Sequence, residues 1–189
     1  MIKVVKEYLE DAFITDKARL KHIYNVEKIA LKLARIYGVN EEKAAIASLL
    51  HDATKLLNHE ENLTLAKRMF DESLLNSTPS PCLHAFSAAF LAKSKFNIDD
   101  EEILNAISYH CSGRANMNKL EMIIYISDYV EESRTFVTEE LRNLAEVNLE
   151  KTVYKILLDT KEYLESNHKA VSNLTLEAIK FYEEICGGI

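Results

Sequence analysis

Helical periodicity runs through almost the whole chain, and it constrains the fold more than any other feature of the sequence. Apolar residues recur at intervals of three and four, and no segment sustains the alternation of a β-strand. Only four glycines and two prolines interrupt the 189 residues, and both prolines fall within residues 76–82. The sequence therefore predicts an all-α protein, a helical bundle that forms a single domain over residues 1–189.

Capping residues predict where several helices begin and end. Asp16 is a candidate N-cap for a long helix that ends at Gly38, and Asn40 begins the next helix. That helix leads into AAIASLLHDATKLL, which is apolar almost all round and is expected in the middle of the domain. The other expected helices cover residues 2–13, 60–71, 83–95, 100–111, 118–132, 138–166 and 173–185, with a loop at 76–82.

Net charge and cysteine usage restrict the partners and the cellular location. A formal charge of −7 repels the phosphate backbone, so nucleic acid is not an expected partner. The first residues lack the apolar core of a signal peptide, and no run approaches the roughly 18 apolar residues of a membrane span. The three cysteines form no C-x-x-C pair, and Cys82 and Cys111 are interpreted as small buried fillers. We expect a cytoplasmic protein without a membrane partner. Its oligomeric state is left open, with a homodimer among the options.

Four of the six histidines and two aspartates lie in apolar, helical surroundings. In chain order they are His22, His51, Asp52, His84, His110 and Asp128. A buried carboxylate is costly unless it is paired or bound to a metal, and imidazole with carboxylate suits Fe, Mn, Zn or Co. Six ligands exceed what one catalytic ion with open positions needs. The sequence therefore predicts a pair of ions, which a carboxylate such as Asp52 can bridge.

The alternative is that these residues are structural. A single histidine in an apolar segment is more often a hydrogen-bonded core residue, and His51 with Asp52 could form a local hydrogen bond near a helix end. Six candidates in this order make coincidence a poor explanation.

Basic residues close to these positions are candidates for binding an anionic substrate. They are Arg19, Lys55, Arg114 and Arg134. Lys55 lies three residues after Asp52 and shares its helix face, and Arg114 follows Gly113, where a small residue permits close backbone approach. A guanidinium can hold two phosphate oxygens at once. The alternative for each is a solvated surface charge.

The order His, His-Asp, Asp resembles the HD-domain metal-dependent phosphohydrolases, and the two extra histidines resemble their dinuclear subset. More closely, the chain resembles the YqeK-type symmetrical bis(5'-nucleosyl)-tetraphosphatases. The matching stretches are RLKH (19–22), LLHDATK (49–55), LHA (83–85) and AISYHCSGRANMNKLEMIIYISDYVEESRTF (106–136). The resemblance places a metal-site core at about 17–136 and the family's C-terminal helices at about 138–186. Cys111 and Ser112 stand where relatives commonly have threonines, which puts in doubt any hydroxyl contact from 111.

The resemblance also implies an activity. Such proteins cleave diadenosine tetraphosphate into two ADP at a di-iron centre, so the six residues above become metal ligands and Asp52, His84 and His110 become catalytic. We expect hydrolysis of a nucleotide or dinucleoside polyphosphate by a metal-bound hydroxide. The cofactor is expected to be two divalent or trivalent ions, with iron first and manganese or another transition metal as alternatives. Residues ATKLL after His51-Asp52 lack the Glu-Asp pair of guanosine tetraphosphate hydrolases, and the Gly-Tyr-Pro signature of cyclic-dinucleotide phosphodiesterases is absent. The remaining alternatives are another HD-type nucleotide phosphohydrolase, such as a phosphomonoesterase, and a nucleotide-binding sensor without turnover.

Overall fold

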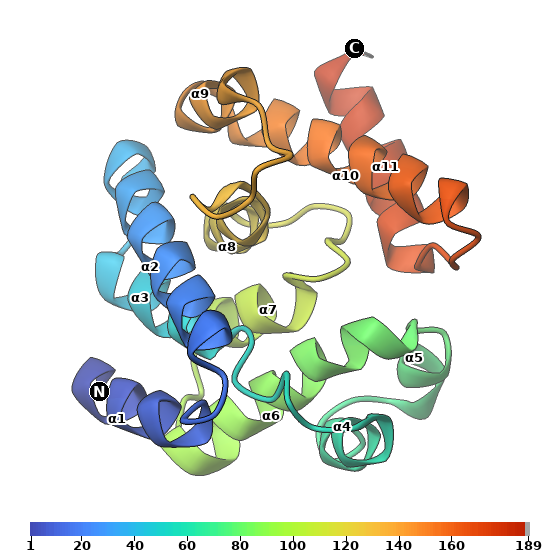
Figure 1. The fold of residues 1–189 in the computed structure, drawn as a ribbon. Helices are drawn as coiled ribbons and strands as arrows, with labels where there is room; N and C mark the ends of the chain where they lie inside the picture. The colour runs from blue at the N-terminus through green and yellow to red at the C-terminus, as the bar shows by residue number, and fades with distance from the viewer. Residues whose placement is uncertain (188–189) are drawn as a thin grey trace.

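The computed structural model describes residues 1–187, and these form helices joined by turns, with no strand among them (Figure 1). The elements are α1 (Ile2–Ala12), α2 (Lys17–Tyr37), α3 (Glu41–Leu50), α4 (His59–Ala66), α5 (Glu72–Asn76), the 3₁₀ turn η1 (Ser80–Cys82), α6 (Leu83–Phe96), α7 (Glu101–Tyr109), α8 (Lys119–Val130), α9 (Glu139–Val147), α10 (Leu149–Ser166) and α11 (Asn173–Cys186). The all-α prediction is confirmed. Residues 188 and 189 of the expected domain lie outside the described residues.

The predicted caps account for the helices around α2 and α3. The Asp16 side chain accepts a hydrogen bond from the backbone N–H of Arg19 at 2.9 Å, and Gly38 ends α2 in the left-handed conformation with φ of 67°. A left-handed residue after the last turn is the common way for a helix to stop, and glycine adopts it without steric cost. Asn40 caps α3 by accepting from the N–H of Lys43.

Helices α2, α3, α7 and α8 pack against one another and form the centre of the molecule. Every side chain from 44 to 50 in α3 is buried, as expected from its apolar sequence. In Figure 1, α1 and the α4–α6 segment lie to one side of this centre, and α9–α11 lie to the other. Helix α6 packs on α7, and α10 packs on α8. Most of the candidate ligands therefore lie on these central helices or directly after them in the chain.

Two helix predictions are wrong. The single helix expected at 138–166 is divided at Asn148, which is extended (φ −153°) and caps α10 by accepting from the N–H of Lys151 at 2.8 Å. The helix expected at 60–71 is α4, which ends at Ala66, and the separate short helix α5 follows. No helix within residues 1–187 combines the length and apolar character needed to cross a membrane.

Candidate metal centre

The structure brings the six candidate ligands together at the centre of the molecule. His22 lies on α2, His51 and Asp52 follow the last turn of α3, His84 is in the first turn of α6, His110 follows α7, and Asp128 is on α8. The four imidazoles and Asp52 are buried, and the Asp128 side chain is 25% exposed. Two groups, His22–His51–Asp128 and His51–Asp52–His110, each place their ligand atoms within 4.8 Å of one another.

The two carboxylate oxygens of Asp52 face different histidines. Oδ2 lies 3.7 Å from Nε2 of His22 and 3.6 Å from Nε2 of His51. Oδ1 lies 3.0 Å from Nε2 of His84 and 3.8 Å from Nε2 of His110. Asp52 therefore lies between two sets of nitrogen atoms, with one carboxylate oxygen directed to each set.

Asp128 lies on the same side as His22 and His51. Its Oδ1 is 3.1 Å from Nε2 of His22 and 3.9 Å from Nε2 of His51. These three side chains and Oδ2 of Asp52 form one half of the cluster. His84, His110 and Oδ1 of Asp52 form the other half.

Hydrogen bonds fix the tautomer of three of the histidines. Nδ1 of His51 donates to the carbonyl of Ser48 at 2.6 Å. His84 and His110 repeat the pattern, with Nδ1 of each donating at 2.7 Å to the carbonyl three residues earlier in the chain. A carbonyl oxygen can only accept, so Nδ1 carries the proton and Nε2 keeps the lone pair that binds a metal.

The Nε2 atoms of His84 and His110 lie 3.2 Å apart. Because Nδ1 is already the donor on both rings, two lone pairs face each other across this distance. Nε2 of His22 and Nε2 of His51 are buried and have no hydrogen-bond partner among residues 1–187. Cations bound within the two halves of the cluster would satisfy these nitrogen atoms, so the donor set fits bound metal.

Burial and the neighbouring charges shift the pKa values of the cluster. Burial lowers the pKa of His51 to about 4, and it also lowers the pKa of His84. Burial is the largest influence on His110 as well and opposes its protonation, but the nearby carboxylates of Asp52 and Asp128 together outweigh it and raise the pKa. For Asp52, burial alone would raise the pKa, but the nearby imidazoles hold it well below its usual range. Asp52 is therefore a carboxylate at neutral pH, as a metal ligand must be.

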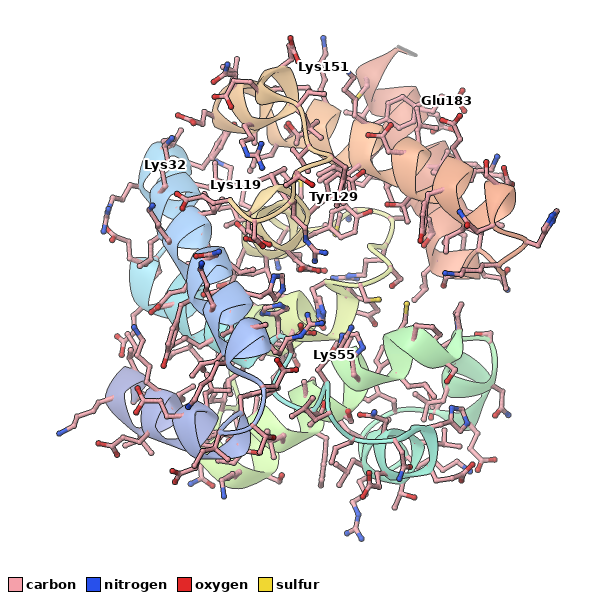
Figure 2. All side chains as sticks on the ribbon, viewed as in Figure 1. Lys32, Lys55, Lys119, Tyr129, Lys151 and Glu183 are labelled. Atoms are coloured by element: carbon pink, nitrogen blue, oxygen red, sulfur yellow. The ribbon has the colours of Figure 1, made fainter. Side chains whose placement is uncertain are left out.

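Three of the four predicted phosphate-binding residues border the cluster. Nη1 of Arg19 lies 2.8 Å from Oδ2 of Asp52, and Nη2 of Arg134 lies 3.2 Å from Oδ1 of Asp128. Nζ of Lys55 lies 3.2 Å from Nε2 of His84, and Figure 2 shows Lys55 near the middle of the molecule. Beside the cluster is an open cavity of about 280 Å³, lined by Asp16, Ala18, Arg19, His22, Glu131, Ser133 and Arg134.

The fourth candidate, Arg114, is held by another partner. Its Nε and Nη2 donate to the two carboxylate oxygens of Glu121 at 2.6 and 2.8 Å, and its guanidinium lies over the Tyr109 ring at 4.8 Å. Glu121 is only 1% exposed. Within residues 1–187, no hydrogen bond or ion pair joins Arg114 to the six clustered side chains.

The sequence interpretation did not assign Glu131, which supports His22. Glu131 is fully buried, and its Oε1 lies 3.3 Å from Nδ1 of His22. Its Oε2 accepts from Nδ2 of Asn25 at 3.0 Å and from the N–H of Ser133 at 2.8 Å. Burial alone would raise the pKa of Glu131, but the hydrogen bonds from Ser133 and its neighbours lower it. The available signal was the spacing Asp-x-x-Glu, which places Glu131 one helical turn after Asp128.

Comparison with known proteins gives consistent matches. The HD domain family model matches residues 19–133. Curated proteins named "Bis(5'-nucleosyl)-tetraphosphatase, symmetrical" are similar to this chain. The one from Bacillus subtilis is 35% identical over 81% of this chain and 83% of its own length. Those from Staphylococcus aureus and Halalkalibacterium halodurans are 33% and 31% identical, over 87% and 84% of this chain and 86% and 85% of their own lengths. A crystal structure from Clostridium acetobutylicum, described as a predicted HD superfamily hydrolase involved in NAD metabolism, aligns with a TM-score of 0.90 at 33% identity over 98% of both chains.

Proposed function

Because the chain belongs to the HD domain family, we propose that it is a metal-dependent hydrolase that cleaves dinucleoside tetraphosphates symmetrically, converting diadenosine tetraphosphate into two ADP. The names of the three curated relatives support this reaction. The observation in this chain that carries the proposal is the position of Asp52. Its two oxygens face separate histidine pairs, beside the cationic side chains of Arg19 and Lys55.

We assign two metal ions to the cluster. His22, His51, Asp128 and Oδ2 of Asp52 would hold one ion, and His84, His110 and Oδ1 of Asp52 would hold the other. When bound, such ions polarise phosphoryl oxygens and lower the pKa of a bound water toward neutrality. We propose iron, which the family resemblance implies, and the same imidazole and carboxylate ligands would accept manganese.

Three cationic side chains at the edge of the cluster would receive the phosphate chain. Lys55 offers a point charge, and Arg19 and Arg134 offer guanidinium groups that can hold two phosphate oxygens. All three now lie against carboxylates of the cluster, within 2.8 to 3.7 Å. Phosphate oxygens can take the place of these contacts. Arg114 is not included, because Glu121 engages two of its donors.

The proposed step is addition of water across the central P–O–P bond. The water oxygen bonds to one inner phosphorus, and the bond from that phosphorus to the central bridging oxygen breaks. The bridging oxygen leaves with the second nucleoside diphosphate, and the protons of the water pass to solvent. Charge that develops on the phosphoryl oxygens is offset by Lys55 and the two arginines, which the fold holds in place before the reaction.

Product analysis tests this function. Protein purified without oxygen and loaded with iron should convert diadenosine tetraphosphate into ADP alone. Formation of AMP and ATP in equal amounts would contradict symmetrical cleavage. The same preparation should be given a panel of nucleoside monophosphates, since faster turnover of these would identify a phosphomonoesterase. Binding of diadenosine tetraphosphate without turnover would identify a sensor.

A further inference from the structure

Two cysteine side chains lie in contact beside the metal centre and have no part in the proposed reaction. Sγ of Cys111 is 2.7 Å from Sγ of Cys82. This is well inside the van der Waals contact of two sulfur atoms, and it is roughly 0.7 Å longer than a disulfide bond of about 2.05 Å. Both residues are partly exposed, and Cys82, whose thiol is the less enclosed of the two, is the one that a small solute reaches first. From this geometry, we propose that Cys82 and Cys111 form a reversible disulfide when the protein meets hydrogen peroxide.

The position of the pair gives the bond a structural consequence. Cys82 ends η1 two residues before His84, and Cys111 follows directly after His110. Nε2 of His84 and Nε2 of His110 lie 3.2 Å apart in the same half of the cluster. A bond between the two sulfurs would therefore tie together the two chain segments that carry these histidines. The two cysteines are 29 residues apart in the sequence. Without the bond, the two segments separate freely when the protein unfolds.

The chemistry needs only the peroxide as oxidant. One sulfur attacks a peroxide oxygen, the O–O bond breaks, and a sulfenic acid and one water form. The second sulfur then attacks the sulfenic sulfur, the S–O bond breaks, and the departing hydroxide takes the second thiol proton as water. Two thiols and one peroxide thus give one disulfide and two waters. The two sulfurs are oxidised by one electron each, and the peroxide is reduced by two. A dithiol reductant reverses the change.

The third cysteine provides a matched control. Cys186 lies at the end of α11 and is also half-buried, but it has no sulfur partner among residues 1–187. Cysteines that react merely because they are accessible would include Cys186. Cysteines that react because they are paired would leave it as a thiol.

The experiment treats the metal-loaded protein with a small molar excess of hydrogen peroxide, stops the reaction with catalase, and titrates thiols after denaturation. We expect the number of thiols to fall from three to one, and proteolysis without reductant should give one peptide that joins Cys82 to Cys111. The melting temperature of the oxidised protein, measured after metal removal, should rise by roughly 5–10 °C, because the bond closes a loop in the unfolded chain. Cys186→Ser should keep these changes, whereas Cys82→Ser and Cys111→Ser should abolish them.

Several results would overturn the proposal. One is three thiols remaining after treatment that is sufficient to oxidise a free cysteine in solution. Another is that the thiols are lost because oxygen atoms add to the sulfurs, and not because a disulfide forms. A third is a linked peptide that contains Cys186. The peptide map of the wild-type protein decides the matter even where a serine variant fails to fold.

Discussion

Replacement of Glu131 by glutamine should weaken metal binding, although it replaces none of the residues that we assign as ligands. Glu131 is fully buried and faces Nδ1 of His22 at 3.3 Å, so its charge favours the ring orientation that points Nε2 at Asp52 and Asp128. Outer carboxylates of this kind typically contribute 10- to 100-fold to metal affinity. Glutamine keeps the shape and removes the charge. If its oxygen faces His22, its amide group meets the N–H donors of Asn25 and Ser133.

We therefore expect Glu131→Gln to bind manganese(II) about 10- to 100-fold more weakly, which corresponds to about 1.4–2.7 kcal/mol. The lost hydrogen bonds to a charged acceptor should also lower the free energy of unfolding by about 2 kcal/mol. That loss shifts the melting temperature by roughly 4–8 °C in a domain of this size. The assay is competition for manganese(II) with a chelator of known affinity, at a temperature well below the transition.

Two controls separate orientation of His22 from general destabilisation. Glu132→Gln changes the neighbouring, exposed carboxylate, which pairs with Lys28, and should leave both quantities unchanged. Asn25→Ala removes one hydrogen bond to Glu131 but keeps the contact between Glu131 and His22, so it should lower stability with little change in metal affinity. The reasoning fails if Glu131→Gln holds manganese(II) within twofold of the wild-type protein.

Other predictions concern the ligands and the cations around them. Asp52→Ala should remain folded by circular dichroism but should lose metal and activity together, and full activity in this variant would refute the bridging assignment. Lys55→Met should lower kcat/KM for diadenosine tetraphosphate about 10- to 100-fold, the value of a charge-assisted hydrogen bond, whereas the exposed Lys67→Met should not. Arg114→Ala should leave KM unchanged and lower the melting temperature by about 4–8 °C. It leaves the buried Glu121 without its partner, at a cost discounted to about 2 kcal/mol because Arg114 is about one-third exposed. A higher KM with an unchanged melting temperature would instead support the phosphate contact that the sequence predicts.

Helix ends could be predicted where the signal is a local capping residue. Asp16, Gly38 and Asn40 act within one turn of the chain. Their capping preferences therefore depend on neighbouring residues and not on the rest of the fold. Asn148 was missed for a related reason. The apolar pattern continues across it, so periodicity alone favours one helix, while its side chain caps α10 and so competes with continued helical hydrogen bonding. Periodicity reports which face is buried and does not report where a helix is interrupted.

The phosphate-binding predictions depended on distance along the chain, and this limited them. Lys55 reaches the cluster because three residues along a helical turn keep it on the side of Asp52. Arg114 is a predicted phosphate ligand because it follows Gly113 in a break after His110, but Glu121, seven residues further along, binds its guanidinium. In the structure Glu121 also caps α8 with Asn118, and its second partner is set by how the chain folds after His110.

The identity of the six clustered residues was predictable because each is a polar group in an apolar segment, but their orientation depends on where each histidine sits in its helix. His51 and His110 follow the last residues of α3 and α7, where carbonyl groups lack intrahelical partners, and each Nδ1 donates to such a carbonyl three residues earlier. His22 lies within α2, where the helix itself engages the preceding carbonyls. Its Nδ1 therefore needs a partner from elsewhere, and Glu131, 109 residues further along, supplies it. A local rule thus orients the histidines at helix ends, whereas the histidine inside a helix requires a tertiary contact that the sequence alone did not reveal.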